Sequence, residues 1–161
     1  MRMLTFVLFA ALSVGPVSGV ARAQGAGLTP EARQAILAYQ LTLPRANHLI
    51  AAMQKMTKYV VSLPDFQDRM ARSMKMTPAE RRAQMEKDPK AMAILKEHGL
   101  STEDYVVGVP ALRMALMAAQ GAAANAAPAS PANLAFAKAN LSELKPKMDA
   151  ADGISARSPK S

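Results

Sequence analysis

Three closely spaced methionines, Met70, Met74 and Met76, offer a possible metal-binding chemistry. The thioether sulfur is a soft ligand that suits Cu(I), and residues four apart share one face of a helix. Methionine also fills gaps in cores and lines adaptable binding surfaces. Met53 and Met56 follow an apolar helical stripe, which favours the core role for that pair. We expect no resident cofactor and keep Cu(I) binding as a third functional hypothesis.

A basic segment overlaps the methionine cluster. Its residues are Arg69, Arg72, Lys75, Arg81 and Arg82, with Glu80 as the acid among them. Such a segment could bind phosphate, lipopolysaccharide or an acidic partner. It has no interleaved aromatic residues on which bases would stack, so we expect no nucleic-acid partner. A solvated helix face is the favoured interpretation.

The remaining titratable residues do not form a catalytic pattern. The chain has no Cys, and its two histidines, His48 and His98, are 50 residues apart. His98 precedes Gly99 at an expected helix end, where a cation complements the helix dipole. We find no nucleophile elbow, phosphate loop, zinc-protease or calcium-loop motif. The sequence therefore predicts no catalytic residue and no enzyme activity.

The first 23 residues are typical of a secretory signal peptide. Arg2 precedes an apolar run over 4–12, and Ala21-Arg22-Ala23 has the small-residue pattern of a cleavage site. The apolar run is shorter than the ~20 residues of a membrane-spanning helix. We predict cleavage after Ala23, giving a periplasmic or secreted protein of residues 24–161 without a membrane span. Loss of Arg2 and Arg22 lowers the formal net charge from +8 to +6.

The elements expected to position these residues are helices. Capping residues at Thr29, Thr77, Asp88 and Ser101 predict helix starts within a helical domain over 24–120. The helix that begins after Thr29 is expected to run to about Leu43, and Pro44 either kinks it or opens the next helix. Apolar residues at three- and four-residue steps predict that next helix over 45–61. A short helix is expected from Phe66 to Met74.

The C-terminal third divides into three expected segments. Residues 121–131 are rich in Ala and Pro, which is typical of a linker. Residues 132–148 carry a narrow apolar stripe that predicts a helix docked on the domain or on a second chain. The polar residues 149–161 are expected to form a disordered tail.

Composition supports one domain without strands. The chain has 161 residues, of which 50% are hydrophobic, enough to form a buried core. No segment alternates apolar and polar residues for long enough to predict a strand. We expect an all-α fold, an irregular bundle of about five to seven helices.

Four short motifs carry a first resemblance. They are Leu28-Thr29-Pro30-Glu31, Asp88-Pro89-x-Ala91, His98-Gly99-Leu100-Ser101-x-x-Asp104-Tyr105 and Pro131-Ala132-Asn133-x-Ala135-Phe136-x-Lys138-Ala139-Asn140. With the signal peptide, they make the chain similar to small exported all-α bacterial proteins of uncharacterised function. This resemblance implies the fold class and export, and it implies no activity.

A second resemblance is local. Leu28-Thr29-Pro30-Glu31-Ala32 and Met76-Thr77-Pro78-Ala79-Glu80 resemble the paired LTxxQ motifs of ATP-independent periplasmic cradle chaperones, with Ala32 and Glu80 at the Gln positions. Those chaperones are small, basic, Met-rich helical proteins. The resemblance implies a holdase that takes unfolded clients, whereas a Thr-Pro pair also simply starts a helix.

These observations lead to a ranked expectation of function. The favoured hypothesis is an exported, non-catalytic binding or structural protein with a protein partner or another ligand still unspecified. The alternative is a periplasmic holdase chaperone, and Cu(I) binding by Met70, Met74 and Met76 is third.

Overall fold

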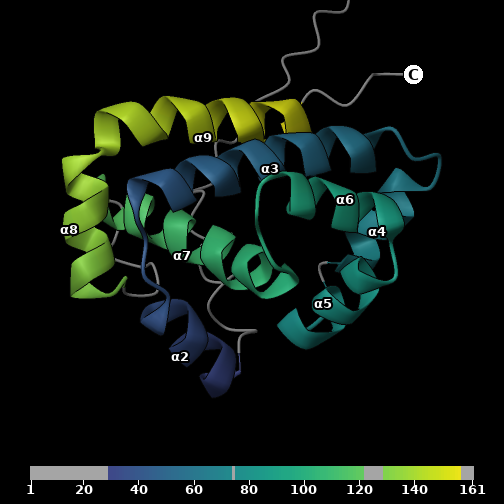
Figure 1. Ribbon diagram of the computed structural model, residues 1–161, viewed down its shortest axis with the longest axis horizontal. Helices are drawn as coiled ribbons and strands as arrows, with labels where there is room; N and C mark the ends of the chain where they lie inside the picture. The colour runs from purple at the N-terminus through teal and green to yellow at the C-terminus, as the bar shows by residue number, and fades with distance from the viewer. Residues whose placement is uncertain (1–28, 74, 122–128, 157–161) are drawn as a thin grey trace, which may run out of the picture.

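The computed structural model describes residues 29–73, 75–121 and 129–156, and these residues form eight helices without a strand (Figure 1). The helices are α2 (Pro30–Ala38), α3 (Leu43–Val61), α4 (Phe66–Ser73), α5 (Pro78–Glu86), α6 (Pro89–Glu97), α7 (Thr102–Ala119), α8 (Pro131–Ala139) and α9 (Leu141–Ala156). The all-α prediction is confirmed, with more helices than the five to seven expected. The predicted signal peptide, Met74 and most of the expected linker lie outside the described residues.

The helix starts are set by local hydrogen bonds. Thr77 and Glu80 form a capping box, in which the Thr77 hydroxyl accepts from the Glu80 amide at 3.2 Å and the Glu80 carboxylate accepts from the Thr77 amide at 2.7 Å. Ser101 and Asp104 form a second box. Asp88 accepts from two backbone amides at the start of α6. Polar side chains thus satisfy the amides that a helix start leaves free.

The boundary between α2 and α3 decides between the two predictions for Pro44. We expected the first helix to run to about Leu43, but α2 ends at Ala38 and an extended backbone follows at Tyr39. Pro44 lies in the first turn of α3, where the missing amide hydrogen removes no helical hydrogen bond. Pro44 therefore opens a helix and does not kink one.

The core lies where α3 and α7 meet the other helices. α9 packs along α3, and α8 packs on α7, as Figure 1 shows for the C-terminal helices. The large side chains that are fully buried come from four helices and are Leu49, Leu95, Leu112 and Leu144. Met53 and Met56 are 4% and 7% exposed, so the pair belongs to the core as its spacing indicated.

The C-terminal segment differs from the expected single helix over 132–148 followed by a tail. Asn140 separates α8 from α9, because its side chain donates to the Phe136 carbonyl at 2.8 Å and ends α8. The chain turns there, and α9 continues to Ala156. The tail prediction is therefore wrong for 149–156, where Ala151 is fully buried and Asp152 pairs with Arg113. Residues 157–161 lie outside the described part.

One buried amide holds the extended linker between α2 and α3 against α8. Asn133 is 3% exposed. Its side-chain oxygen accepts from the Leu41 amide at 3.1 Å, and its side-chain nitrogen donates to the Tyr39 carbonyl at 2.7 Å. The linker backbone leaves the helical pattern here, so these two groups need partners from elsewhere. We call this arrangement the Asn133 clamp.

Candidate functional site

A cavity of about 360 Å³ is lined by the C-terminal part of α3, by α4 and α5, by the start of α6 and by the first half of α7. Figure 1 shows α4, α5 and α6 at the end of the molecule opposite α8. Small-molecule sites commonly have volumes of about 300–1,000 Å³ and mainly apolar walls with a few polar groups. The lining residues of this cavity fit that description. The cavity is therefore the candidate functional site.

Helix α4 forms one wall of the cavity. Its lining residues are Phe66, Arg69, Met70 and Ser73, whose spacing of three, four and seven residues defines a single helix face. α4 has no buried residue, and it is not among the closely packed helix pairs of the described chain. The Met70 side chain is 43% exposed, and among the described residues it is the large apolar side chain that is exposed to solvent. α4 covers the cavity without filling it.

The other walls are mostly apolar. α3 contributes Met56 and Val60, and α7 contributes Val106 and Val109. Met85 from α5 also lines the cavity. Together with Met70, three methionines from three helices thus meet at this cavity, and their unbranched side chains adapt to ligands of different shape. The walls are suited to an apolar ligand body.

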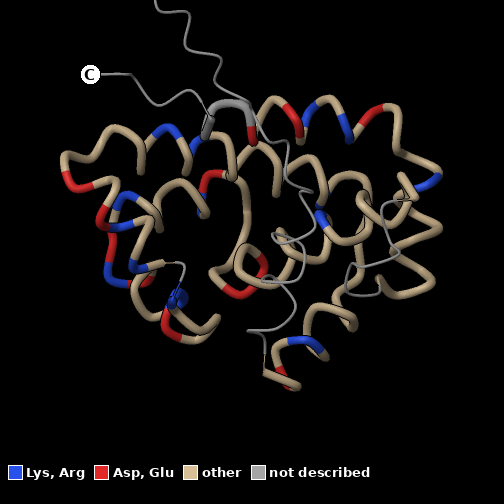
Figure 2. The backbone as a smooth tube through the Cα atoms, turned by 180° about the vertical axis from the view of Figure 1, so that it is seen from behind, with Lys and Arg blue, Asp and Glu red and all other residues tan. Residues whose placement is uncertain are grey.

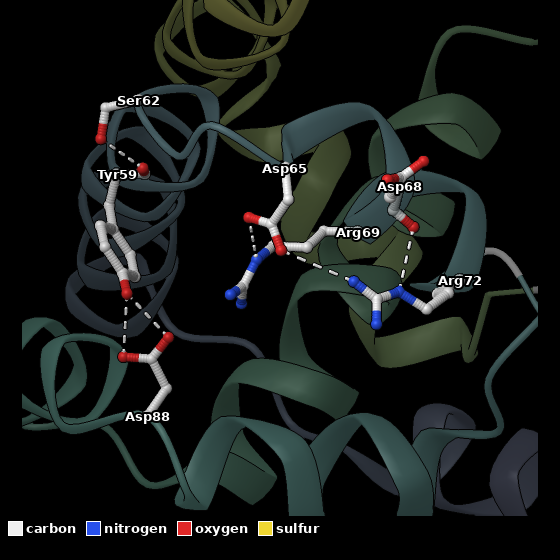
Figure 3. Close-up of polar contacts among 7 residues, drawn as sticks. All are labelled: Tyr59, Ser62, Asp65, Asp68, Arg69, Arg72 and Asp88. Carbon is white, nitrogen blue, oxygen red and sulfur yellow. Dashed lines mark hydrogen bonds and ion pairs between the residues drawn. The ribbon is translucent and has the colours of Figure 1, made fainter.

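Tyr59 and Asp88 line the cavity and form a hydrogen-bonded pair with each other (Figure 3). The Tyr59 hydroxyl donates to the two carboxylate oxygens of Asp88 at 2.8 and 3.1 Å, and this hydrogen bond raises the pKa of Tyr59. Asp88 also caps α6. Lys90 lies 5.9 Å from the centre of the Tyr59 ring. The pair joins α3 to α6, and its role is structural.

Arg69 is also paired inside the protein. Asp65 accepts from the Arg69 Nε at 2.7 Å and lies 3.6 Å from Arg72 (Figure 3). The Arg69 hydrogen bond is the main cause that lowers the pKa of Asp65. The carboxylate thus compensates part of the positive charge on α4, at the point where the chain turns from α3 into that helix.

Other polar residues of the cavity lining have spare hydrogen-bonding capacity, and three of them come from α5 and α7. Arg81 donates through Nε and Nη2 to the Met76 carbonyl at 3.3 and 3.1 Å, and it makes no ion pair within the described residues. The side chains of Gln84 and Tyr105 make no hydrogen bond to any part of the chain that the structure describes. Burial raises the pKa of Tyr105 to about 12, which keeps its hydroxyl protonated and able to donate.

The methionines singled out in the sequence are not gathered as predicted. Met70 lines the cavity, whereas Met76 is half-buried outside the lining, with its carbonyl bound by Arg81. Met74 lies outside the described residues. The structure instead brings Met70 to Met56 and Met85, a grouping that spacing along the chain does not reveal because the three lie on different helices.

The basic segment is neutralised in part by ion pairs. Arg69 and Arg72 contact Asp65, and Arg82 pairs with Glu103 of α7. Viewed from behind, acidic and basic residues both occur at the end of the molecule that α4 and α5 occupy (Figure 2). This arrangement agrees with a mostly solvated and paired face. Within the described residues Lys75 and Arg81 make no ion pair; Lys75 is exposed, whereas Arg81 lines the cavity.

The two histidines lie away from the cavity lining. His48 is exposed on α3. His98 is the C-cap of α6, and its Nε2 is buried without a hydrogen-bond partner in the described structure. Among the described residues, no group of three His, Cys, Asp or Glu side chains is placed to hold a metal ion.

The sequence indicated Arg81 and Met70 but missed Gln84 and Tyr105. The α4 face was detectable in principle from its three- and four-residue steps, whereas Tyr105 gave no sign beyond its place at a helix start. Comparison of the chain with protein-family models, curated proteins and solved structures finds no match. In the described residues, no helix is both long and apolar enough to cross a membrane.

Proposed function

We propose that this protein is a non-catalytic binding protein that takes a small molecule with an apolar body into the cavity between α3, α4, α5 and α7. The observation that carries the proposal is the α4 wall. An amphipathic helix normally buries its apolar face in a core, but Phe66 and Met70 on this face line an open space of about 360 Å³.

The distribution of apolar surface favours a small ligand over an unfolded protein client. A holdase needs a broad apolar patch, of several hundred Å² or more on typical proteins. Among the described residues, Met70 is the large apolar side chain that is exposed, and a single such residue does not form a broad patch. Suppression of the aggregation of several unrelated clients at stoichiometric amounts would favour the chaperone alternative instead.

The binding proposal is tested with an uncharged, environment-sensitive probe, N-phenyl-1-naphthylamine, added to the protein from residue 24 onward. Saturable fluorescence enhancement at one site per chain is the expected result. Met70→Glu places a charge on the lining face of α4 and is expected to weaken the probe at least about tenfold, because the carboxylate loses water when the probe binds. Met70 is 43% exposed, so the variant keeps its fold.

Ala71→Glu is the matched control, because Ala71 is exposed on the same helix and does not line the cavity. We expect its probe affinity to stay within about twofold of the wild type, since surface substitutions generally have small effects. Absence of saturable binding, or equal losses in both variants, contradicts the proposal.

We also propose that the protein is exported and acts in the periplasm or outside the cell. The support is the signal-peptide pattern over residues 1–23. Expression of the full chain in a Gram-negative host, followed by fractionation and N-terminal sequencing, is expected to give a periplasmic protein that begins at Gln24. Recovery of the uncleaved chain from the cytoplasm argues against export.

A further inference from the structure

The polar residues at the cavity fall into two groups, according to whether they already have a partner. Tyr59 and Asp88 bind each other, and Asp65 matches the charge of Arg69 through its Nε. Arg81 retains a guanidinium charge with no ion pair in the described residues, and Tyr105 retains a free hydroxyl donor. Unpaired donors beside an apolar cavity are the usual means of fixing the polar end of a ligand.

The unpaired donors lie on two helices that pack together. Arg81 and Gln84 are three residues apart on α5, so they share one face, and both line the cavity. Tyr105 lines it from α7, which packs against α5. The three side chains thus line the cavity from two adjacent helices, α5 and α7.

The charge of this group selects the chemistry of the ligand. A guanidinium has five N–H donors and no acceptor, and Arg81 uses two of its three nitrogens on the Met76 carbonyl. The remaining donors suit a carboxylate or phosphate, which arginine binds through charge-assisted hydrogen bonds. Gln84 and Tyr105 add neutral donors for a second oxygen. An uncharged or cationic ligand head would leave the Arg81 charge unmatched.

We propose that the ligand is an anionic amphiphile: an apolar chain that occupies the Met-lined part of the cavity and an acidic head, carboxylate or phosphate monoester, that binds Arg81 with Gln84 and Tyr105. This inference rests on the proposed function. It adds the chemical class of the ligand and the residues that recognise its charge.

The test measures displacement of the neutral probe by four ligands with the same decyl chain: decanoate, decyl phosphate, decanol and decylamine. The wild type is expected to bind at least one acid about tenfold more tightly than decanol, and decylamine most weakly. Comparison of decanoate with decyl phosphate distinguishes a fatty acid from a phosphate ester. The preference for acids is expected to fall as salt concentration rises, because salt screens the charge of a partly exposed pair.

Arg81→Gln is expected to abolish the preference for acids and to leave the affinity for decanol within about twofold, a split that a mere loss of folding would not produce. Arg72→Gln is the control, because Arg72 lies on α4 outside the cavity lining; it is expected to keep the preference. Equal binding of decanol and the acids by the wild type overturns the inference while the binding function stands. Equal loss in both variants also overturns it, and failure of the neutral probe to bind removes both proposals.

Discussion

The Asn133 clamp and the cavity both bring polar groups into apolar surroundings, but they leave those groups in different states. At the clamp, one amide satisfies the Leu41 amide hydrogen and the Tyr39 carbonyl, and Asn133 itself is almost fully buried. At the cavity, Arg81 and Tyr105 keep donors that no described residue accepts from. A buried polar group that is fully paired stabilises the fold, whereas donors beside open space are free to bind water or the ligand that we propose.

The two regions also differ in how their helices are held. α8 and α9 pack closely on α7 and α3 and bury Ala137, Leu144 and Ala151 completely. α4 buries no residue. We therefore expect substitutions at the clamp to reduce stability strongly, and substitutions at the cavity to reduce it less. Four predictions follow this contrast, in order of decreasing effect.

The largest effect is expected for Asn133→Ala. The substitution leaves the Leu41 amide and the Tyr39 carbonyl without partners, and together these losses are expected to lower the free energy of unfolding by about 2–4 kcal/mol. Urea unfolding followed by circular dichroism measures the change. Asn47→Ala removes an exposed side-chain hydrogen bond to Glu143 and is expected to change stability by less than about 1 kcal/mol. Similar values for the two variants would mean that Asn133 is not a clamp.

A smaller loss is expected for Gly108→Ala in α7. A Cβ atom at this position would lie 2.8 Å from the Tyr39 ring and 2.9 Å from Leu49 Cδ1. Overpacking of this kind costs about 1–3 kcal/mol, and the better helix propensity of Ala returns up to about 1 kcal/mol. We expect a net loss of about 1–2 kcal/mol in urea unfolding. A stability gain would show that Tyr39 moves aside easily and that the packing next to the clamp is loose.

At the cavity, Tyr59→Phe is expected to have a modest effect. It removes the hydroxyl that donates to Asp88, while Asp88 still caps α6. The side chain is only partly buried, so the loss is expected to be about 0.5–1 kcal/mol, with probe affinity unchanged within about twofold. A loss above about 2 kcal/mol would mean that Tyr59 contributes to stability as strongly as Asn133 does, contrary to the expected difference between the cavity and the clamp.

The smallest effect appears only at alkaline pH. Burial, together with the Asp104 charge, raises the pKa of Tyr39 to about 12, and burial raises that of Tyr105 to about 12. The ordinary tyrosine pKa is about 10, so the unfolded chain releases these protons first. The corresponding stability is complete below about pH 10 and is lost as the pH rises towards 12.

Urea unfolding at several pH values in this range tests the point. Tyr39→Phe and Tyr105→Phe are each expected to make the alkaline decline less steep while leaving the decline caused by the other tyrosine in place. An unchanged slope in Tyr105→Phe would show that its hydroxyl reaches water through the cavity and titrates normally. If only Tyr39→Phe makes the alkaline decline less steep, then Tyr39 beside the clamp is shielded from water and Tyr105 at the cavity is not.

Much of the fold could be predicted because helix starts depend on neighbours three residues apart. The caps at Thr77, Asp88 and Ser101 lie where their side chains indicated. The division of the C-terminal segment has a local sign, the Asn140 side chain that ends α8, but the sequence does not show that α8 and α9 pack on different helices. The early end of α2 depends on a distant contact, since Asn133 holds the Tyr39–Leu41 backbone in place.

The candidate site was predictable only in its parts. Met70 and Arg81 were chosen from the sequence, but the cavity needs faces from α3, α4, α5 and α7 at once. Spacing within one helix shows which residues share a face, and it does not show which face of another helix they meet. Tyr105 gained significance only from its place on the cavity wall and its lack of a hydrogen-bond partner.

The clamp has a consequence for the order of folding. The Leu41–Asn133 hydrogen bond joins residues 92 positions apart, whereas the cavity walls all come from residues 56–109. Contacts between distant residues require a larger loop to close and tend to form late. We therefore expect the docking of α8 on the α2–α3 linker to follow the folding transition state. Stopped-flow kinetics of Asn133→Ala would then show faster unfolding with nearly unchanged refolding. The clamp would thus act mainly by slowing the unfolding of the native state.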